Sequence, residues 1–148
     1  MIAQTNGGLL ITQIKQIGGR IFEKLLQDAG IEAFNGAQGR ILHVLWQADG
    51  IPIVELAQRT GLAKTTLTSM LDRMEAAGLV KRSFDQRDRR QVLIVLTRAA
   101  RALDRQYEEV STQMNEVYYA GFSDEEILAF EGALKRVLNN LVEKEKRL

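Results

Sequence analysis

Two short helices joined by a glycine turn are encoded by residues 52–78, which read PIVELAQRTGLAKTTLTSMLDRMEAAG. Pro52 suits the first turn of a helix, where no backbone donor is needed, and Gly61 suits its end. The second helix spans 64–77 and ends before Gly78, because apolar side chains repeat at three- and four-residue steps: Leu67, Met70, Leu71 and Met74. This stretch therefore predicts a helix-turn-helix.

A β-hairpin with a charged tip is expected directly after these helices. Residues 79–84 and 91–96 favour strands because they are rich in apolar and β-branched side chains. The six residues between them, Asp85 to Arg90, are polar throughout. Two short helices followed by a hairpin are the outline of a winged helix-turn-helix.

Amphipathic helices flank this region on both sides. Apolar residues recur at helical spacing over 10–26 and again over 36–47. Thr97 is expected to cap one long helix that ends near Gly121, and Ser123 opens a last helix with a capping box. We expect one mainly helical chain, 1–148, with a small hairpin wing. Its winged helix-turn-helix would cover 36–97, between dimerisation helices at 9–29 and 98–146.

The flanking helices carry more regularly spaced apolar surface than a small winged core can cover. We therefore expect a homodimer. Four aromatic side chains fit either its interface or an intrachain core, and the sequence leaves both open: Tyr107, Tyr118, Tyr119 and Phe122. A two-fold dimer with two reading helices predicts an inverted-repeat DNA site.

Positive charge is concentrated in the expected reading region. The chain has a net charge of only +1, but residues 64–105 hold 10 basic and 5 acidic side chains. The candidate DNA contacts on the second helix are hydroxyls and cations: Lys64, Thr65, Thr66, Thr68, Ser69 and Arg73. Those on the hairpin are all basic: Lys81, Arg82, Arg87, Arg89 and Arg90.

Each group of candidates has a plainer interpretation. For the second helix, the alternative is that its hydroxyls cover a solvated face. Asp85 and Asp88 either pair with neighbouring arginines and shape the tip, or cancel its charge. The concentration of basic residues and the order of elements together favour DNA binding.

Composition argues against an enzyme and against a metal site. The chain has no cysteine and a single histidine, His43, so no nucleophile and base can be paired. The acidic run 124–126 is better explained by a helix N-terminus than by a metal. We expect no cofactor, no membrane partner and, from the lack of a signal peptide or apolar span, a cytoplasmic location.

The chain resembles the MarR family of transcription regulators over nearly its whole length. The resemblance is carried by 54–62, by 71–82 and most distinctively by the tip, Asp85-Gln86-Arg87-Asp88-Arg89-Arg90, which runs into an apolar strand closing with Leu96-Thr97. It implies that Arg87, with Arg89 or Arg90, enters the minor groove while Asp85 holds the tip in shape. Ser69 and Ala100 depart from residues common in the family.

The resemblance also implies a small amphipathic or phenolic effector in a crevice near the dimer helices. Its candidate lining in this chain is Ile14, Ile17, Phe22, His43 and Trp46. The leading hypothesis is a homodimeric, sequence-specific DNA-binding regulator, a repressor that an effector releases. The alternatives are a constitutive DNA-binding dimer without effector and a winged-helix module that binds a protein.

Overall fold

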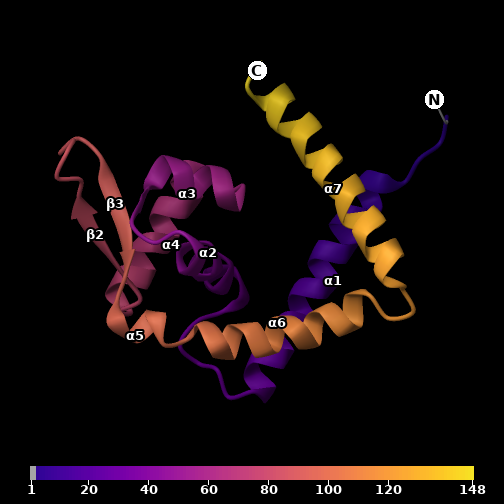
Figure 1. Cartoon of the computed structure of the whole chain (residues 1–148), viewed down its shortest axis with the longest axis horizontal. Coiled ribbons are helices and arrows are strands. Elements are labelled where there is room, and N and C mark those ends of the chain that lie inside the picture. Colours follow the sequence, from indigo (N-terminus) through magenta and orange to yellow (C-terminus); the bar gives the residue numbers. More distant parts are fainter. Residues whose placement is uncertain (1–2) are drawn as a thin grey trace. The chain divides into compact units, whose positions relative to one another are not determined.

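A computed structural model describes residues 3–148 of the chain. The chain folds into two compact units that divide between Met114 and Asn115. Its helices and strands, labelled in Figure 1, are α1 (Gly7–Asp28), α2 (Gly36–Gln47), β1 (Ile51–Pro52), α3 (Ile53–Thr60), α4 (Lys64–Ala76), β2 (Val80–Phe84), β3 (Val92–Leu96), α5 (Arg98–Arg101), α6 (Asp104–Tyr118) and α7 (Asp124–Glu145). The expected mainly helical winged helix-turn-helix is confirmed.

The wing is a three-stranded antiparallel sheet in the order β1-β3-β2, and its first strand was not expected. Ile51 pairs with Ile94 and Pro52 with Leu93. Pro52 therefore ends a strand and caps α3 with extended backbone, rather than lying in the first turn of that helix. A strand of two residues is too short to show the alternation by which a sequence reveals strands.

The helix-turn-helix forms as the apolar spacing predicts. Gly61 closes α3 at φ 74°, a left-handed conformation that glycine adopts without strain. Leu67, Leu71 and Met74 of α4 are fully buried, whereas Met70 is half-buried. The buried stripe joins the core residues of α2 and α3, which fixes the opposite face of α4 toward solvent.

The single helix expected after Thr97 is interrupted between α5 and α6. Thr97 does cap α5, accepting a hydrogen bond from the backbone N–H of Ala100. The Ala100 carbonyl, however, accepts from Trp46 Nε1 at 3.0 Å and from Leu103 N at 3.1 Å. The tight i to i+3 bond from Leu103 replaces regular α-helical bonding, so the helix breaks at this point.

Helix α1 carries two apolar faces rather than one. Phe22 and Leu26 are buried in the core. Leu25 is half-buried against the core, and the other large apolar residues are between 36% and 60% exposed: Leu9, Leu10, Ile11, Ile14, Ile17 and Ile21. The continuous stripe predicted from the sequence thus divides into a core-facing part and an uncovered part.

The second unit contains the end of α6 and helix α7. The capping box predicted at Ser123 is confirmed, because its side chain accepts from Glu126 N and the Glu126 carboxylate accepts from Ser123 N. These bonds hold the pKa of Glu126 below its usual value. Tyr119, Phe122 and Phe130 pack edge to face near the turn.

The four aromatic residues whose place was left open have different environments. Tyr107 is 5% exposed and belongs to the core, where it contacts Phe22, Phe34 and Trp46. Tyr118 and Phe122 are exposed, and Tyr119 is half-buried. Across residues 3–148, none of the helices has the length and apolarity needed to cross a membrane.

Candidate nucleic-acid interface

Helix α4 presents a hydroxyl-rich face to solvent. All six of its candidate DNA contacts are exposed: Lys64, Thr65, Thr66, Thr68, Ser69 and Arg73. They lie on this face because the apolar residues of the same helix are held in the core. The helix has the buried and exposed faces that major-groove reading requires.

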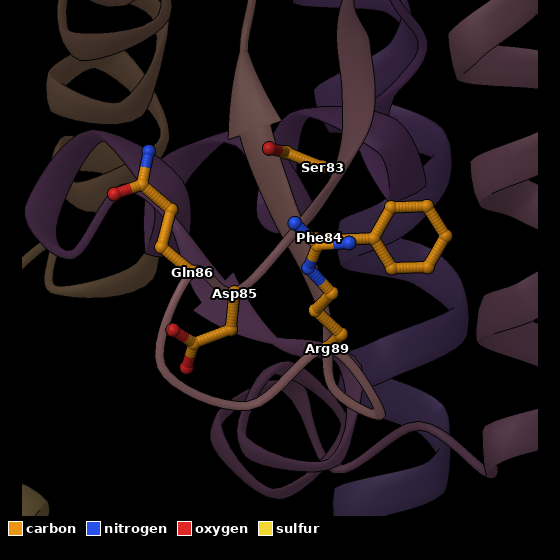
Figure 2. A pocket seen from close by; sticks show the side chains of 5 residues that line it. All are labelled: Ser83, Phe84, Asp85, Gln86 and Arg89. Carbon is orange, nitrogen blue, oxygen red and sulfur yellow. The ribbon is translucent and has the colours of Figure 1, made fainter.

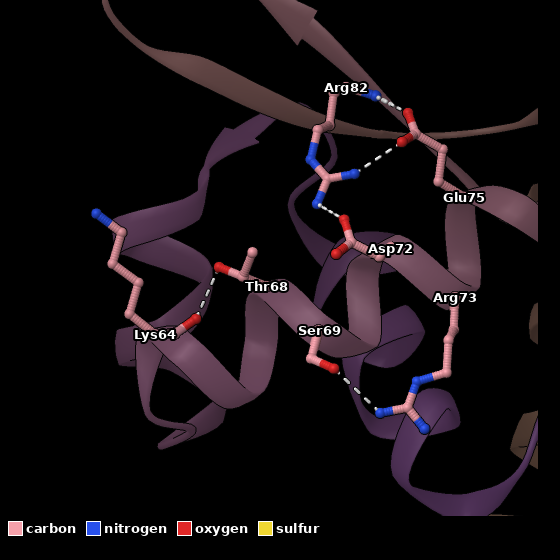
Figure 3. A network of polar contacts seen from close by, with 7 residues as sticks. All are labelled: Lys64, Thr68, Ser69, Asp72, Arg73, Glu75 and Arg82. Carbon is pink, nitrogen blue, oxygen red and sulfur yellow. Dashed lines mark hydrogen bonds and ion pairs between the residues drawn. The ribbon is translucent and has the colours of Figure 1, made fainter.

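Two local hydrogen bonds orient the exposed side chains of α4 (Figure 3). Thr68 Oγ1 donates to the Lys64 carbonyl at 2.8 Å, so its hydroxyl proton is used within the helix. Arg73 Nη2 donates to Ser69 Oγ at 3.2 Å. Ser69 therefore supports the guanidinium of Arg73 in this structure.

Arg82 lies at the base of the wing and is bonded to α4 (Figure 3). Its Nη1 donates to Glu75 Oε1 at 2.7 Å and its Nη2 to Asp72 Oδ1 at 2.8 Å. The backbone N–H of Arg82 also donates to Glu75 Oε2. The structure thus brings Arg82 to the acidic side chains of α4, and it connects the hairpin to that helix.

Sequence reasoning missed the part played by Asp72 and Glu75. Their three-residue spacing places both on one side of a helix, which was the available signal. Their partner, Arg82, lies on another element, so no local pattern identifies it. Lys81, next to Arg82, is exposed.

The wing tip is shaped by two carboxylates. Asp85 Oδ1 accepts from the backbone N–H of Arg87 at 2.9 Å. Asp88 Oδ1 accepts from the backbone N–H of Arg90 at 3.1 Å and from its Nε at 3.0 Å. The Arg90 side chain and backbone hold the pKa of Asp88 below its usual value.

Two of the three tip arginines lack an acidic partner within residues 3–148. Arg87 and Arg89 are exposed and form no ion pair there, whereas Arg90 pairs with Asp88. Asp85 and Asp88 both shape the tip by accepting backbone hydrogen bonds, which is the first of the two interpretations. The second, cancellation of the tip's charge, applies only to Arg90, which pairs with Asp88. The tip offers two available cations on a hydrogen-bonded turn.

The candidate crevice residues do not gather at one hollow. Phe22 and Trp46 pack around Tyr107, and His43 stacks on the same ring at 5.5 Å between centroids. Ile14 and Ile17 lie on the uncovered face of α1. Only Phe22 lines the hollow described next.

A hollow of about 480 Å³ lies where α1, α2 and the α3–α4 turn meet. Its apolar lining includes Phe22, Leu62 and Met70, and its rim includes Lys15, Arg20 and Arg40. Among the described residues, no three acidic or histidine side chains are grouped as metal ligands. The lining combines apolar and basic groups with the Glu23 carboxylate, which accepts a hydrogen bond from Gly36 N, and a hollow of this kind suits a small organic ligand.

Comparison with known proteins gives the same family from sequence and from structure. The model of the MarR family matches residues 34–92. The Homoprotocatechuate degradative operon repressor of Escherichia coli is 36% identical over 81 residues, which are 55% of this chain and 53% of that protein. The alignments span 32%, 66% and 53% of the first three curated relatives.

Solved structures extend the similarity to most of the chain. A mutant MarR from Escherichia coli, crystallised with operator DNA, is 29% identical with a TM-score of 0.78, covering 88% of this chain and 92% of that one. BpsR of Bordetella bronchiseptica, whose DNA binding is regulated by 6-hydroxynicotinic acid, is 25% identical with a TM-score of 0.79. That similarity covers 93% of this chain and 95% of BpsR.

Proposed function

Because the chain belongs to the MarR family of transcription regulators, we propose that it is a homodimeric, sequence-specific DNA-binding regulator rather than an enzyme. The observation that carries the proposal is the pairing of an outward hydroxyl-rich face on α4 with a wing whose tip exposes Arg87 and Arg89. Helix α4 would read base edges in the major groove, and the tip would hold the minor groove or its phosphates.

The proposed contacts have different roles. Lys64, Thr65, Thr66, Thr68 and Arg73 face the groove, with Ser69 orienting Arg73. Lys81, Arg87, Arg89 and Arg90 neutralise phosphate or enter the minor groove, and Asp85 shapes the tip. The charge of Arg82 is used mainly in ion pairs with α4, because its Nη1 and Nη2 both donate to carboxylates of that helix.

Homodimer formation is supported by apolar surface that the single chain leaves uncovered. Helix α1 exposes Ile14 and Ile17 at 48% and 49%, and α7 exposes Leu138 and Leu141 at 57% and 62%. Such stripes on long helices are typical of helix association. We assign 36–97 to DNA binding and 9–29 with 98–146 to dimerisation, in a chain that acts in the cytoplasm.

Effector-released repression is the finer part of the proposal. One relative is a repressor by name, and BpsR is regulated by a small aromatic acid. In this chain, such an effector would bind in the hollow near α2. That hollow is lined by Met70 of α4 and by the basic residues Arg20 and Arg40. A ligand there would shift the position of α4 relative to the core and so lower the affinity of the protein for DNA.

The direct test is selection from a random duplex DNA library with the purified protein at near-physiological salt. We expect an inverted repeat with half-sites about 10 base pairs apart, one helical turn, as a dimer requires. Enrichment of no sequence would contradict specific binding and favour the winged-helix module that binds a protein.

The selected duplex then tests the wing and the effector separately. The double variant Arg87→Ala/Arg89→Ala is expected to bind the duplex more weakly while remaining dimeric, and unchanged affinity would contradict the wing assignment. Titration of the complex with small aromatic acids is expected to release DNA. If none does so, the constitutive dimer becomes the better description.

A further inference from the structure

One large apolar side chain of the wing has no place in the core. Phe84, the last residue of β2, is 68% exposed. Its neighbours along the chain are Ser83 and the polar tip that begins at Asp85. The ring contributes little to folding while it stays in water, and it lies directly before the basic tip of the wing.

The register of the hairpin fixes the side to which Phe84 belongs. Side chains alternate along a strand, so Phe84 shares a face with Val80 and Arg82. Val80 is buried, and Arg82 bonds to carboxylates of α4. Phe84 therefore continues, beyond the core, the face of the wing that is turned toward α4.

The close view of the tip shows how its side chains are divided between the two sides of the hairpin. In Figure 2 the ring of Phe84 points to one side of the hairpin, while the side chains of Asp85 and Gln86 point to the other. An open hollow of about 800 Å³ at the tip is lined by Ser83, Phe84, Asp85, Gln86 and Arg89. The exposed ring thus lies beside a cation that has no ion pair within residues 3–148.

We infer that Phe84 is an apolar DNA contact, packing on the sugar edges of the minor groove beside the phosphates that Arg87 and Arg89 neutralise. The inference rests on the proposed function. DNA fits this surface because it presents apolar deoxyribose faces within a polyanionic backbone. One partner can therefore cover the phenyl ring and neutralise the guanidinium groups at the same time. A second copy of the wing would instead place like charges next to one another.

The experiment measures binding of the selected duplex by fluorescence anisotropy across a salt series, for the wild type and four variants. We expect Phe84→Ala to lose about tenfold in affinity, the loss of one apolar contact, with the slope of log affinity against log salt unchanged. We expect Arg87→Ala to reduce that slope by about one. Phe84→Leu keeps apolar surface and is expected to retain most of the affinity.

Gln86→Ala, on the same turn but polar, is the matched control and is expected to bind as the wild type does. Sedimentation and circular dichroism check that each variant keeps its association state and fold. Wild-type affinity in Phe84→Ala overturns the inference, as does a slope reduced to that of Arg87→Ala. Dimer loss in Phe84→Ala overturns it in favour of a second copy. Absence of wild-type binding contradicts the proposed function itself.

Discussion

At the scale of single residues, Thr68 shows how a local bond decides which group meets a partner. Its hydroxyl is used by the Lys64 carbonyl, four residues earlier in α4. The hydroxyl can then only accept a hydrogen bond from a partner, and the γ-methyl group is available to contact the floor of the major groove, where thymine also presents a methyl.

We therefore expect Thr68→Val to bind the selected duplex within about threefold of the wild type, and Thr68→Ser to bind more weakly. Valine keeps the methyl groups and shape, whereas serine keeps only the hydroxyl, and a lost methyl contact in the groove is worth roughly 1 kcal/mol. Anisotropy titrations of both variants provide the measurement. Tighter binding by the serine variant would show that the hydroxyl reads DNA.

Gly39 in α2 is a residue-scale constraint on the core. A Cβ at this position would lie 2.7 Å from Tyr107 Cε2 and 3.1 Å from Phe34 Cε2, and both rings are buried. Gly39→Ala is expected to lower the free energy of unfolding by about 1–3 kcal/mol, because the rings have to shift.

Gly19→Ala in α1 is the matched control for this prediction. A Cβ there meets no atom within 4 Å, so alanine is expected to stabilise the helix by about 0.5–1 kcal/mol. Chemical denaturation of both variants gives the comparison. Equal stabilities would contradict the packing seen around Tyr107.

At the scale of elements, the backbone N–H and the guanidinium group of Arg82 both connect the hairpin to α4. Arg82 is 27% exposed and bridges Asp72 and Glu75, so it links two elements of the reading surface. Ion pairs at a surface contribute little to global stability. Their effect here is expected in the local order of the hairpin.

Arg82→Ala is accordingly expected to speed amide hydrogen exchange in β2 and β3 while leaving the unfolding transition nearly unchanged. In DNA titrations it should change the salt slope less than Arg87→Ala does, because its charge is already paired with carboxylates. A slope change of about one for Arg82→Ala would place its guanidinium on phosphate instead.

A side-chain hydrogen bond links the turn between α6 and α7 to helix α7. Tyr119 Oη donates to Glu131 Oε2 at 2.6 Å, and this hydrogen bond, with the negative charge nearby, raises the pKa of Tyr119 to about 12. Because the pKa of Tyr119 is raised in the folded state, the hydrogen bond stabilises the turn fully at pH values below about 10, the pKa of tyrosine in an unfolded chain. This stabilisation is lost as the pH rises through about 12, the pKa in the folded state.

Spectrophotometric titration is expected to show one tyrosine ionising near pH 12, and Glu131→Gln should move it to lower pH. Tyr118→Phe is the control, since it removes a neighbouring tyrosine without touching the bond. If Glu131→Gln leaves every tyrosine titration where it was, the hydrogen bond is absent in solution.

Local patterns predicted most of these elements. Helix α2 begins at Gly36 as expected, because Asn35 and Gln38 form a capping box there. At the break between α5 and α6 the Ala100 carbonyl accepts from Trp46, 54 residues earlier in the chain, and β1 depends on its pairing with β3. The ion pairs of Arg82 likewise join separate elements, so periodicity and caps carry no signal for them.

At the scale of the whole molecule, each unit leaves an apolar helix face uncovered, and we have proposed a second copy as its cover. Leu141→Glu on α7 is expected to shift the protein from dimer to monomer in sedimentation velocity, because it places a charge where an apolar contact is proposed. Asn140→Glu adds the same charge at the adjacent polar position and should stay dimeric.

Circular dichroism is expected to be unchanged in both variants, since Leu141 is 62% exposed in the single chain. A dimer that tolerates Leu141→Glu would remove α7 from the interface. DNA affinity should fall together with dimerisation, because one half-site alone then holds the protein.

The bond from Trp46 to the Ala100 carbonyl gives the molecule a built-in optical reporter. Trp46 is the only tryptophan of the chain, so its emission can be recorded without labelling. Its indole ring is half-buried and lies 5.4 Å from the ring of Tyr107. Any event that loosens the junction of α2 and α5, whether effector binding, operator binding or heating, will change the colour and intensity of that emission.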